Sequence, residues 1–391
     1  MEILVVILIC LALSFLISEI FYRFKYPPVL GPIFAGMVLG LPVFRQVFKG
    51  NVITDIEFLS GLGIIFLLFL AGMEINLKKL VKTEYDSIFI SVFATAIPFL
   101  FGFGAMRIAG YSYTASLILG AALSVSAAST NIKILLDLNA LNTKLGTIIL
   151  GAGIIDDFFE LIFLSGLVVI AQKTLERLMW FPIEISAFIF ITFLTYKFIP
   201  KLITLIQIEK TRMADFSVLI IFAISIALIS TKLSLSPIIG AFVAGIIINV
   251  IHHRTKRLKK HYEEVNELKV LTFSLIIPFF FINTGLHFNF ETLITNFWFV
   301  LMILIIATAG KIIGALVAKP LTDLSWKQAY LVGWGLNSRG GVELVIAEVA
   351  RMNGLISTEV YSAIIIVAIL STLLFPIVLR NIIEKDRKIL Y

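Results

Sequence analysis

The chain contains little charge and almost no cysteine. Only 15% of its 391 residues are Asp, Glu, Lys or Arg, whereas a soluble globular protein has about 25%. Hydrophobic residues make up 59%, and the mean hydropathy is +1.03, so the composition predicts a membrane protein with several spans. The single cysteine, Cys10, excludes an internal disulfide.

Other absences exclude classes of function. The chain has no His-Glu-x-x-His sequence, which excludes a zinc protease of that type. The chain lacks a filter-like glycine repeat of the kind that would indicate an ion channel. Asp156 and Asp157 are the only aspartates near the middle of an apolar run, and neighbours on one helix point about 100° apart. An intramembrane aspartyl protease, which needs two aspartates facing each other from separate helices, is therefore excluded.

The apolar residues fall into thirteen runs, most of them long enough for a membrane-spanning helix. The runs are approximately 3–22, 28–48, 55–75, 86–108, 113–137, 144–172, 180–206, 215–232, 234–252, 270–287, 295–319, 325–350 and 358–380. With the N-terminus outside, 23 of the 32 basic residues fall in inner connections and 7 in outer ones. The positive-inside rule therefore predicts a multi-pass protein of the plasma membrane with a cytoplasmic C-terminus. It also explains the net charge of +7 without nucleic acid as a partner.

Six ionisable residues lie inside apolar runs, where no connection can account for them. They are Asp156, Asp157, Glu160, Lys311, Arg339 and Glu343. A charged side chain at the centre of a bilayer costs roughly 2.5 to 3.5 kcal/mol or more, so such residues require a wet cavity, a counter-charge or a proton. The alternative is a structural ion pair between helices. Six groups at a similar depth favour a functional site.

Two runs carry short polar stretches that weaken a helix. The fifth contains Ser124 to Asn131, with Ser126, Ser129 and Asn131, and the twelfth contains Gly335 to Gly341, with Asn337. Serine and threonine can bond their own backbone, so each stretch is a candidate for an unwound break in the membrane. The alternative is close helix packing through small residues.

The order of the runs predicts an inverted repeat. With the seventh run as a linker, the first six and last six runs form two halves, and the fifth and twelfth runs occupy equivalent places. Equivalent helices then cross the membrane in opposite directions. In transporters of this layout two broken helices meet near the midplane and form the transport site. The predicted fold is an all-α polytopic membrane protein with about thirteen transmembrane helices and two crossed, discontinuous ones.

Three features together resemble a known family: the Asp156-Asp157 pair in the sixth run, Lys311 in the eleventh, and Asn-Ser-Arg-Gly-Gly-Val-Glu-Leu from Asn337 to Leu344. They are similar to the monovalent cation/proton antiporter superfamily, in particular its CPA2 branch of bacterial and archaeal sodium/proton exchangers. The resemblance covers essentially the whole chain. It implies an ion-translocating core at about 86–172 and 295–380, a dimerisation panel at about 1–75 and 215–287, and a linker helix at about 180–206.

The resemblance also implies roles for individual residues. Asp157 would be the principal acceptor of cation and proton, Asp156 would pair with Lys311 in the empty site, and Thr130 would complete the cation's coordination. Arg339 and Glu343, four residues apart, would form a structural pair within the broken helix. Many relatives have proline before that arginine, where this chain has Ser338.

Glu160 lies one helical turn beyond the aspartate pair, on a similar face. It could be a carboxylate on the access path or a paired structural residue, and the sequence favours neither.

The function predicted from these observations is exchange of a monovalent cation, sodium or lithium first, for protons by alternating access. Proton and cation would compete for the aspartate pair, because the same oxygens hold both poorly at once. The alternatives are a potassium/proton antiporter of the same superfamily and a sodium-coupled symporter of an organic anion. No cofactor and no enzymatic activity are expected; the expected partners are membrane lipid, the transported ions and a second copy in a homodimer. Such exchange would serve pH homeostasis.

Overall fold

The computed structural model describes most of the chain. The described residues are 3–24, 26–44, 48, 50–74, 85–126, 135, 140, 143–171, 183–184, 186–197, 212–233, 235–254 and 258–390. Throughout this part of the chain the regular structure is helical, without strands. The predicted all-α class is therefore confirmed for the residues described.

Six of the described helical segments are long and apolar enough to cross a membrane. They are Ile3–Arg23, Asn51–Glu74, Tyr85–Ile108, Val265–Leu286, Phe297–Leu321 and Thr358–Lys385. Shorter apolar helices are Leu30–Leu39, Tyr113–Ser124, Lys144–Gly153, Ser186–Lys197, Phe216–Lys232 and Pro237–Ile251. The total of thirteen spans and the crossing of two helices stay predictions, because segments such as 127–134 and 198–211 lie outside the described residues.

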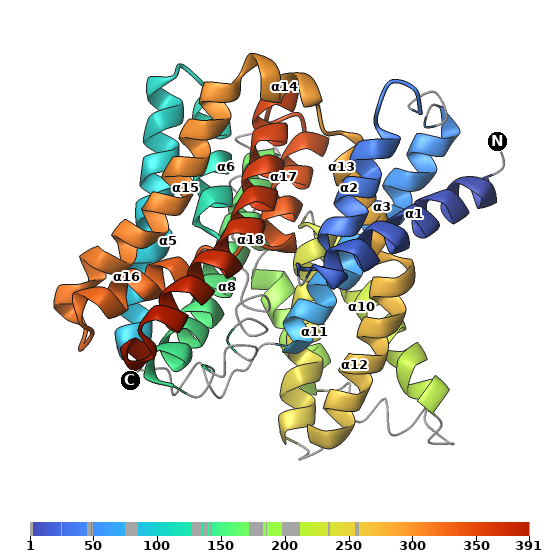
Figure 1. The fold of residues 1–391 in the computed structure, drawn as a ribbon. Helices are drawn as coiled ribbons and strands as arrows, with labels where there is room; N and C mark the ends of the chain where they lie inside the picture. The colour runs from blue at the N-terminus through green and yellow to red at the C-terminus, as the bar shows by residue number, and fades with distance from the viewer. Residues whose placement is uncertain are drawn as a thin grey trace. The chain divides into compact units, whose positions relative to one another are not determined.

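The chain divides into two compact units. Unit 1 comprises Met1–Ile17, Gly31–Ile75 and Val168–Leu286. Its helices are α1 (Ile3–Arg23, up to Ile17), α2 (Leu30–Leu39), α3 (Asn51–Glu74), the segment Ser186–Lys197, α10 (Arg212–Lys232), α11 (Pro237–Arg254), α12 (Leu258–Leu275) and α13 (Ile277–Leu286). Helix α3 contacts α10, α11, α12 and α13, and can be followed in Figure 1 among the blue and yellow helices.

Glycine lets the backbones of unit 1 approach closely. A Cβ atom at Gly72 of α3 would overlap the carbonyl of Phe242 in α11, and one at Gly245 of α11 would overlap the carbonyl of Phe69. Only a residue without a side chain permits this contact. A separate apolar core of unit 1 is built from α1, α2, α3 and α13 together with Phe48, and includes Val6, Cys10, Ala35, Leu39, Ile56, Phe279, Ile282 and Leu286.

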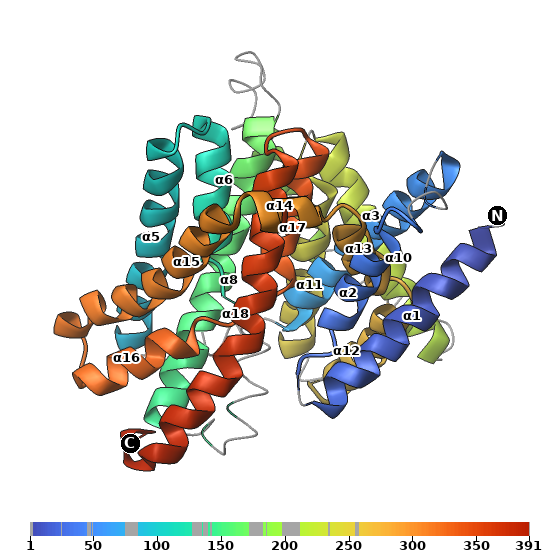
Figure 2. The same ribbon diagram turned by 45° about the horizontal axis from the view of Figure 1, so that its top comes forward.

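Unit 2 comprises Ser18–Leu30, Asn76–Leu167 and His287–Tyr391. Its helices are α5 (Tyr85–Ile108), α6 (Tyr113–Ser124), α8 (Lys144–Ala171, up to Leu167), α14 (Phe290–Thr295), α15 (Phe297–Ala318), η1 (Lys319–Leu321), α16 (Trp326–Gly335), α17 (Gly341–Met352), α18 (Thr358–Lys385) and η2 (Arg387–Leu390). Helix α15 packs along α5 in both views of the ribbon (Figures 1 and 2) and also contacts α16 and α18. Helix α17 contacts α6 and α18.

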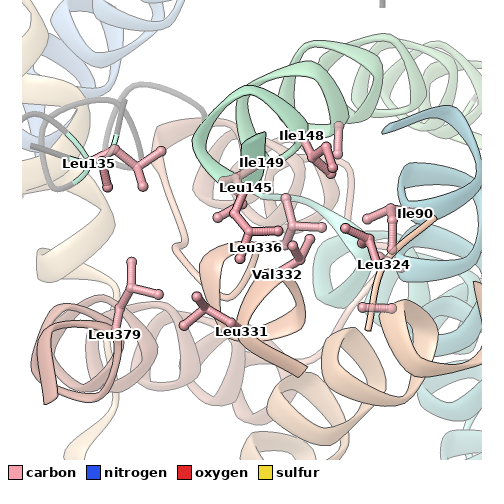
Figure 3. Close-up of a cluster of buried hydrophobic side chains, with 14 of the residues drawn as sticks. Ile90, Leu135, Leu145, Ile148, Ile149, Leu324, Leu331, Val332, Leu336 and Leu379 are labelled. Carbon is pink, nitrogen blue, oxygen red and sulfur yellow. The ribbon is translucent and has the colours of Figure 1, made fainter. Parts of the chain in front are cut away.

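The apolar core of unit 2 fixes the first half of α8. Leu145, Ile148 and Ile149 of α8 point towards Val332 and Leu336, in and just after α16 (Figure 3). The same face of α8 continues through the buried Ala152 to Asp156, four residues further on. The packing of α8 on α16 thus determines where Asp156 projects.

Helix ends of unit 2 that are predicted to lie on the same side of the membrane contact each other. The Lys144 ammonium donates to the Asp323 carbonyl at 3.1 Å, and both residues belong to predicted inner connections. In a predicted outer connection, the ring of Tyr111 stacks on that of Phe299 with centroids 5.3 Å apart. Burial, and then the neighbouring Glu359 carboxylate, raise the pKa of Tyr111 to about 12.

One predicted boundary differs from the structure. The run at 270–287 corresponds to the apolar helical segment Val265–Leu286, but the helix already begins at Leu258 in α12, within the basic stretch before that run. Apolar residues at helical spacing explain this: Val265, Leu268 and Thr272 are buried on one face of α12. A turn at Ile276 then separates α12 from α13, whose second residue is Pro278, a position where proline is tolerated.

Candidate ion-binding site

A buried carboxylate lies at the centre of unit 2. Asp156 of α8 is 1% exposed, and four side chains donate hydrogen bonds to it. The hydroxyls of Ser91 and Thr95 donate to Oδ1 at 2.6 and 2.9 Å. The hydroxyl of Ser126 and the ammonium of Lys311 donate to Oδ2 at 2.7 and 3.0 Å. Two acceptor oxygens therefore share four donors that come from α5, α15 and the segment after α6.

Helix α5 brings its two hydroxyls to Asp156 because they are four residues apart. Ser91 and Thr95 consequently lie on one face of the helix. The adjacent face of α5 packs against α15, where Gly314 meets Ala94 and Gly310 meets Pro98. A Cβ atom at either glycine would lie within 2.9 Å of α5 backbone atoms, so the two helices approach closely on both sides of Lys311.

Lys311 provides the positive charge of the site. Its side chain is fully buried, and its ammonium bonds both Asp156 and the Ser124 carbonyl. Removing one partner of such a buried pair typically costs about 3–5 kcal/mol, because the other charge is left without compensation. A carboxylate in this position can exchange its ammonium partner for another cation or for a proton.

The C-terminal end of α6 binds a second positively charged side chain, that of Arg339. Helix α6 ends at Ser124, and Val125 is extended with φ −75° and ψ 146°. The last carbonyls of a helix lack intrahelical partners and carry partial negative charge. One of them, at Ala122, accepts a hydrogen bond of 2.9 Å from the Arg339 guanidinium, close to the Ser124 carbonyl that Lys311 bonds. Two buried cations thus stabilise the terminus of α6.

The twelfth apolar run is two helices with a break between them. Helix α16 ends at Gly335, and α17 begins after Gly340, which is extended at φ −142°. Asn337 lies in the break and donates to the carbonyl of Gly333 in α16 at 3.0 Å and to that of Thr308 in α15 at 3.3 Å. The Arg339 carbonyl accepts from Thr372 of α18 at 3.2 Å. The bonds to the Gly333 and Arg339 carbonyls provide partners for backbone groups at the break.

Arg339 and Glu343 form a loose pair. Arg339 Nη1 lies 3.5 Å from Glu343 Oε1, and both side chains are almost completely buried. Glu343 Oε2 and Arg339 Nε have no hydrogen-bond partner among the described residues. The guanidinium bonds the carbonyls of Ala122 and, at 3.4 Å, Ala307. Its shortest contact is therefore with the end of α6 rather than with the carboxylate.

The structure therefore brings five predicted residues into two adjoining networks: Asp156, Lys311 and Ser126 in one, Arg339 and Glu343 in the other. Asn337 lies in the break before Arg339. Asp157 and Glu160 lie in α8, but their side chains are outside the described part of the structure. Thr130, Ser129 and Asn131 also lie outside the described residues.

Ser91 and Thr95 are site residues that the sequence did not predict. The only signal for them is a pair of hydroxyls four residues apart on an apolar run.

Glu348 is a further buried carboxylate that was not singled out. It accepts from Arg351 Nη2 at 2.7 Å and from the Tyr361 hydroxyl at 2.6 Å. The sequence signal for this pair is an arginine three residues after a glutamate, a spacing at which two side chains meet on a helix. This cluster links the end of α17 to α18.

Comparisons with known proteins agree with this architecture. A family model described as "Sodium/hydrogen exchanger, transmembrane" matches residues 6–385. The chain is 28% identical to a Na(+)/H(+) antiporter of Enterococcus hirae, with 98% of this chain and 99% of the relative covered. It is 27% identical to the Na(+)/H(+)-K(+) antiporter GerN of Bacillus cereus, with 93% and 92% covered. The solved sodium proton antiporter MjNhaP1 of Methanocaldococcus jannaschii has a similar fold, with a TM-score of 0.70, 16% identity, and 98% and 96% covered.

Proposed function

The chain belongs to the sodium/hydrogen exchanger family, and on this premise we propose that it is a secondary active antiporter of the plasma membrane that exchanges sodium or lithium for protons. Asp156 and Asp157 provide the carboxylates at which cation and proton compete. Transport proceeds by alternating access, with the site open to one side of the membrane at a time.

The environment of Asp156 is the observation that carries this proposal. Its carboxylate accepts hydrogen bonds from four donors, one of them the Lys311 ammonium, so both oxygens have partners when no cation is bound. A sodium ion that binds Asp156 replaces the counter-charge that Lys311 supplies. A proton that binds instead neutralises the same carboxylate. One group thus serves either ion, but not both well.

Asp157 extends the site in a second direction. Adjacent residues of a helix point about 100° apart, so its carboxylate cannot repeat the contacts of Asp156. We assign it the principal cation-binding role, with Thr130 and backbone carbonyls near the end of α6 as further oxygen ligands. Hard oxygen donors of this kind suit small cations without a preferred geometry.

Competition is sufficient to couple the two fluxes in opposite directions. If the site can change sides only when it carries either cation or protons, each passage of a cation inward requires protons to leave, and the reverse. Two carboxylates allow two protons for one sodium, which makes the cycle electrogenic. A current of zero during sodium-driven proton movement would contradict that stoichiometry.

The division into two units supports a division of labour. Unit 2 contains every residue of the proposed site that the structure describes, and it overlaps the ranges 86–172 and 295–380 assigned to the translocating core. Unit 1 overlaps the ranges 1–75 and 215–287 assigned to a panel that forms a homodimer. The contacts Lys144–Asp323 and Tyr111–Phe299 support a common sidedness of the helix ends in unit 2.

Potassium is the second candidate ion. The relative from Bacillus cereus carries potassium as well as sodium in its name. Ion preference depends on the size and number of oxygen ligands, and those include residues 127–134, outside the described part of the chain.

The proposal is tested by proton flux in proteoliposomes with a preset pH gradient. Sodium, lithium or potassium is added in turn to the wild-type protein and to Asp157→Asn. We expect sodium or lithium to dissipate the gradient in the wild type only. If no cation moves protons at any pH, antiport is wrong; sodium-dependent uptake of an organic anion would then replace it.

A further inference from the structure

The two oxygens of Asp156 have different kinds of partner. Oδ1 accepts from Ser91 and Thr95, both uncharged and both in α5. Oδ2 accepts from Ser126 and from Lys311, so it alone bonds the positive charge. A proton or cation that replaces Lys311 therefore meets Oδ2, while Oδ1 keeps its partners.

The α5 hydroxyls have an easier alternative, which they do not take. A buried hydroxyl in a helix usually bonds a carbonyl one turn earlier. Ser116 does so with the Ser112 carbonyl at 2.8 Å, and Thr272 with the Leu268 carbonyl at 2.7 Å. Ser91 and Thr95 instead donate to a carboxylate 65 and 61 residues later in the chain.

The segment of α5 that carries these hydroxyls is firmly positioned. Ala94 and Pro98 lie against Gly314 and Gly310 of α15 at distances that exclude any side chain there. Such backbone contacts leave little freedom for α5 to move relative to α15. The hydroxyls are therefore held in place independently of whether Lys311 bonds Asp156.

We infer that Ser91 and Thr95 are positioning residues for the exchange reaction: they hold Oδ1 of Asp156, so that Oδ2 alone exchanges Lys311 for a proton or cation. This inference rests on the proposed antiport function and specifies how its central carboxylate is controlled.

The effect of removing the donors follows from the geometry. Without the two O–H groups, Oδ1 is a buried acceptor without these partners, and the carboxylate is no longer held in the orientation that presents Oδ2 to a cation. The charged group that faces Asp156 from α15 is Lys311, and Asp157 follows it in α8. Arg339 and Glu343, in and after the break before α17, bond α6 and each other. All four charges remain when the hydroxyls are removed.

The test uses Ser91→Ala, Thr95→Val and the double variant, reconstituted in proteoliposomes. The apparent KM for sodium should rise by up to about tenfold in each single variant and further in the double variant, because each change removes a hydrogen bond to a charged group. The maximal rate at saturating sodium should change less than the KM. Thr95→Ser, which keeps the hydroxyl, should keep the wild-type KM.

Matched controls remove buried hydroxyls that bond only their own helix in the contacts described above. Ser116→Ala and Thr272→Val should leave the KM for sodium unchanged. Size-exclusion chromatography in detergent identifies any variant that fails to fold; if one does, the remaining single variant and Thr95→Ser carry the test.

Two results would overturn the inference. One is a wild-type KM and maximal rate in folded Ser91→Ala and Thr95→Val. The other is a reduced maximal rate with an unchanged KM, which would indicate a purely structural role. In both cases wild-type exchange still stands, so the proposed function survives; absence of exchange in the wild type would instead refute the proposed function itself.

Discussion

The two units bury different kinds of group. Among the described residues, all charged side chains that are fully buried belong to unit 2: Asp156, Lys311, Arg339, Glu343 and Glu348. The ion pair Glu74–Lys269 of unit 1 has side chains 39% and 41% exposed. Unit 1 instead packs through glycines, such as Gly72 on α11. The comparison indicates that unit 1 is built for rigid packing, whereas unit 2 maintains charges that are expensive to bury unless they have a function.

The largest effect should come from breaking the charge network of unit 2. Asp156→Asn leaves the Lys311 ammonium buried without a carboxylate, which should cost about 3–5 kcal/mol of stability. Sodium-driven proton flux should fall to background, and the melting temperature in detergent should drop. Asp86→Asn is the control: its side-chain oxygen accepts from the Asp323 backbone at 3.2 Å near the start of α5, and flux should persist. Wild-type flux in Asp156→Asn would contradict the site.

Arg339 and Glu343 separate two ways of stabilising the broken helix. Arg339→Gln is too short to reach the carbonyls of Ala122 and Ala307, so we expect a loss of about 1.5–3 kcal/mol. Glu343→Gln keeps the shape and removes only a contact of 3.5 Å, so its loss should be smaller. Thermal unfolding of both variants shows which one loses more stability. Equal destabilisation would mean that the ion pair, and not the bonding to α6, holds Arg339.

A glycine pair in one helix tests the packing of unit 1. Gly72→Ala places a methyl group against the Phe242 carbonyl, which should cost about 1–3 kcal/mol. Gly61→Ala is in the same helix with nothing within 4 Å of its added Cβ, and it should be neutral or stabilise by up to about 1 kcal/mol. The melting temperature of Gly72→Ala should be below that of the wild type, whereas that of Gly61→Ala should be equal to it or higher. A tolerated Gly72→Ala would remove the evidence for tight packing between α3 and α11.

The smallest effect should come from the exposed ion pair of unit 1. Lys269→Met breaks the 2.7 Å contact with Glu74, but exposed pairs contribute about 0–1 kcal/mol. We expect nearly unchanged stability and full proton flux. A loss of flux comparable to that of Asp156→Asn would show that unit 1 also carries a charge essential for transport.

Much of this architecture could be predicted because charged residues are easily recognised within the long apolar runs of a membrane protein. An ionised residue in an apolar run is rare and costly, which is why Asp156, Lys311, Arg339 and Glu343 could be selected from the sequence. Family membership, predicted from these residues and from the segment Asn337 to Leu344, is confirmed by the match over residues 6–385. The all-helical class is confirmed for the described residues as well.

The remaining features depend on contacts that sequence does not display. A serine in an apolar helix bonds its own backbone in one case, Ser116, and a distant carboxylate in another, Ser91. Only the tertiary arrangement distinguishes them. Glu348 was overlooked because it lies near the end of a run, where a solvated carboxylate is ordinary. The start of helix α12 was missed because its charged residues dominate the average hydropathy, although Val265 and Leu268 provide a buried face.

Proton release shows whether proton and cation compete for the same carboxylates in unit 2. Sodium is added to the purified protein in weakly buffered detergent solution with a pH indicator, while calorimetry records binding. If the two ions compete, sodium binding releases protons over the pH range of activity, and that release disappears in Asp157→Asn and Asp156→Asn. Sodium binding without proton release, or undiminished release in both variants, would contradict it.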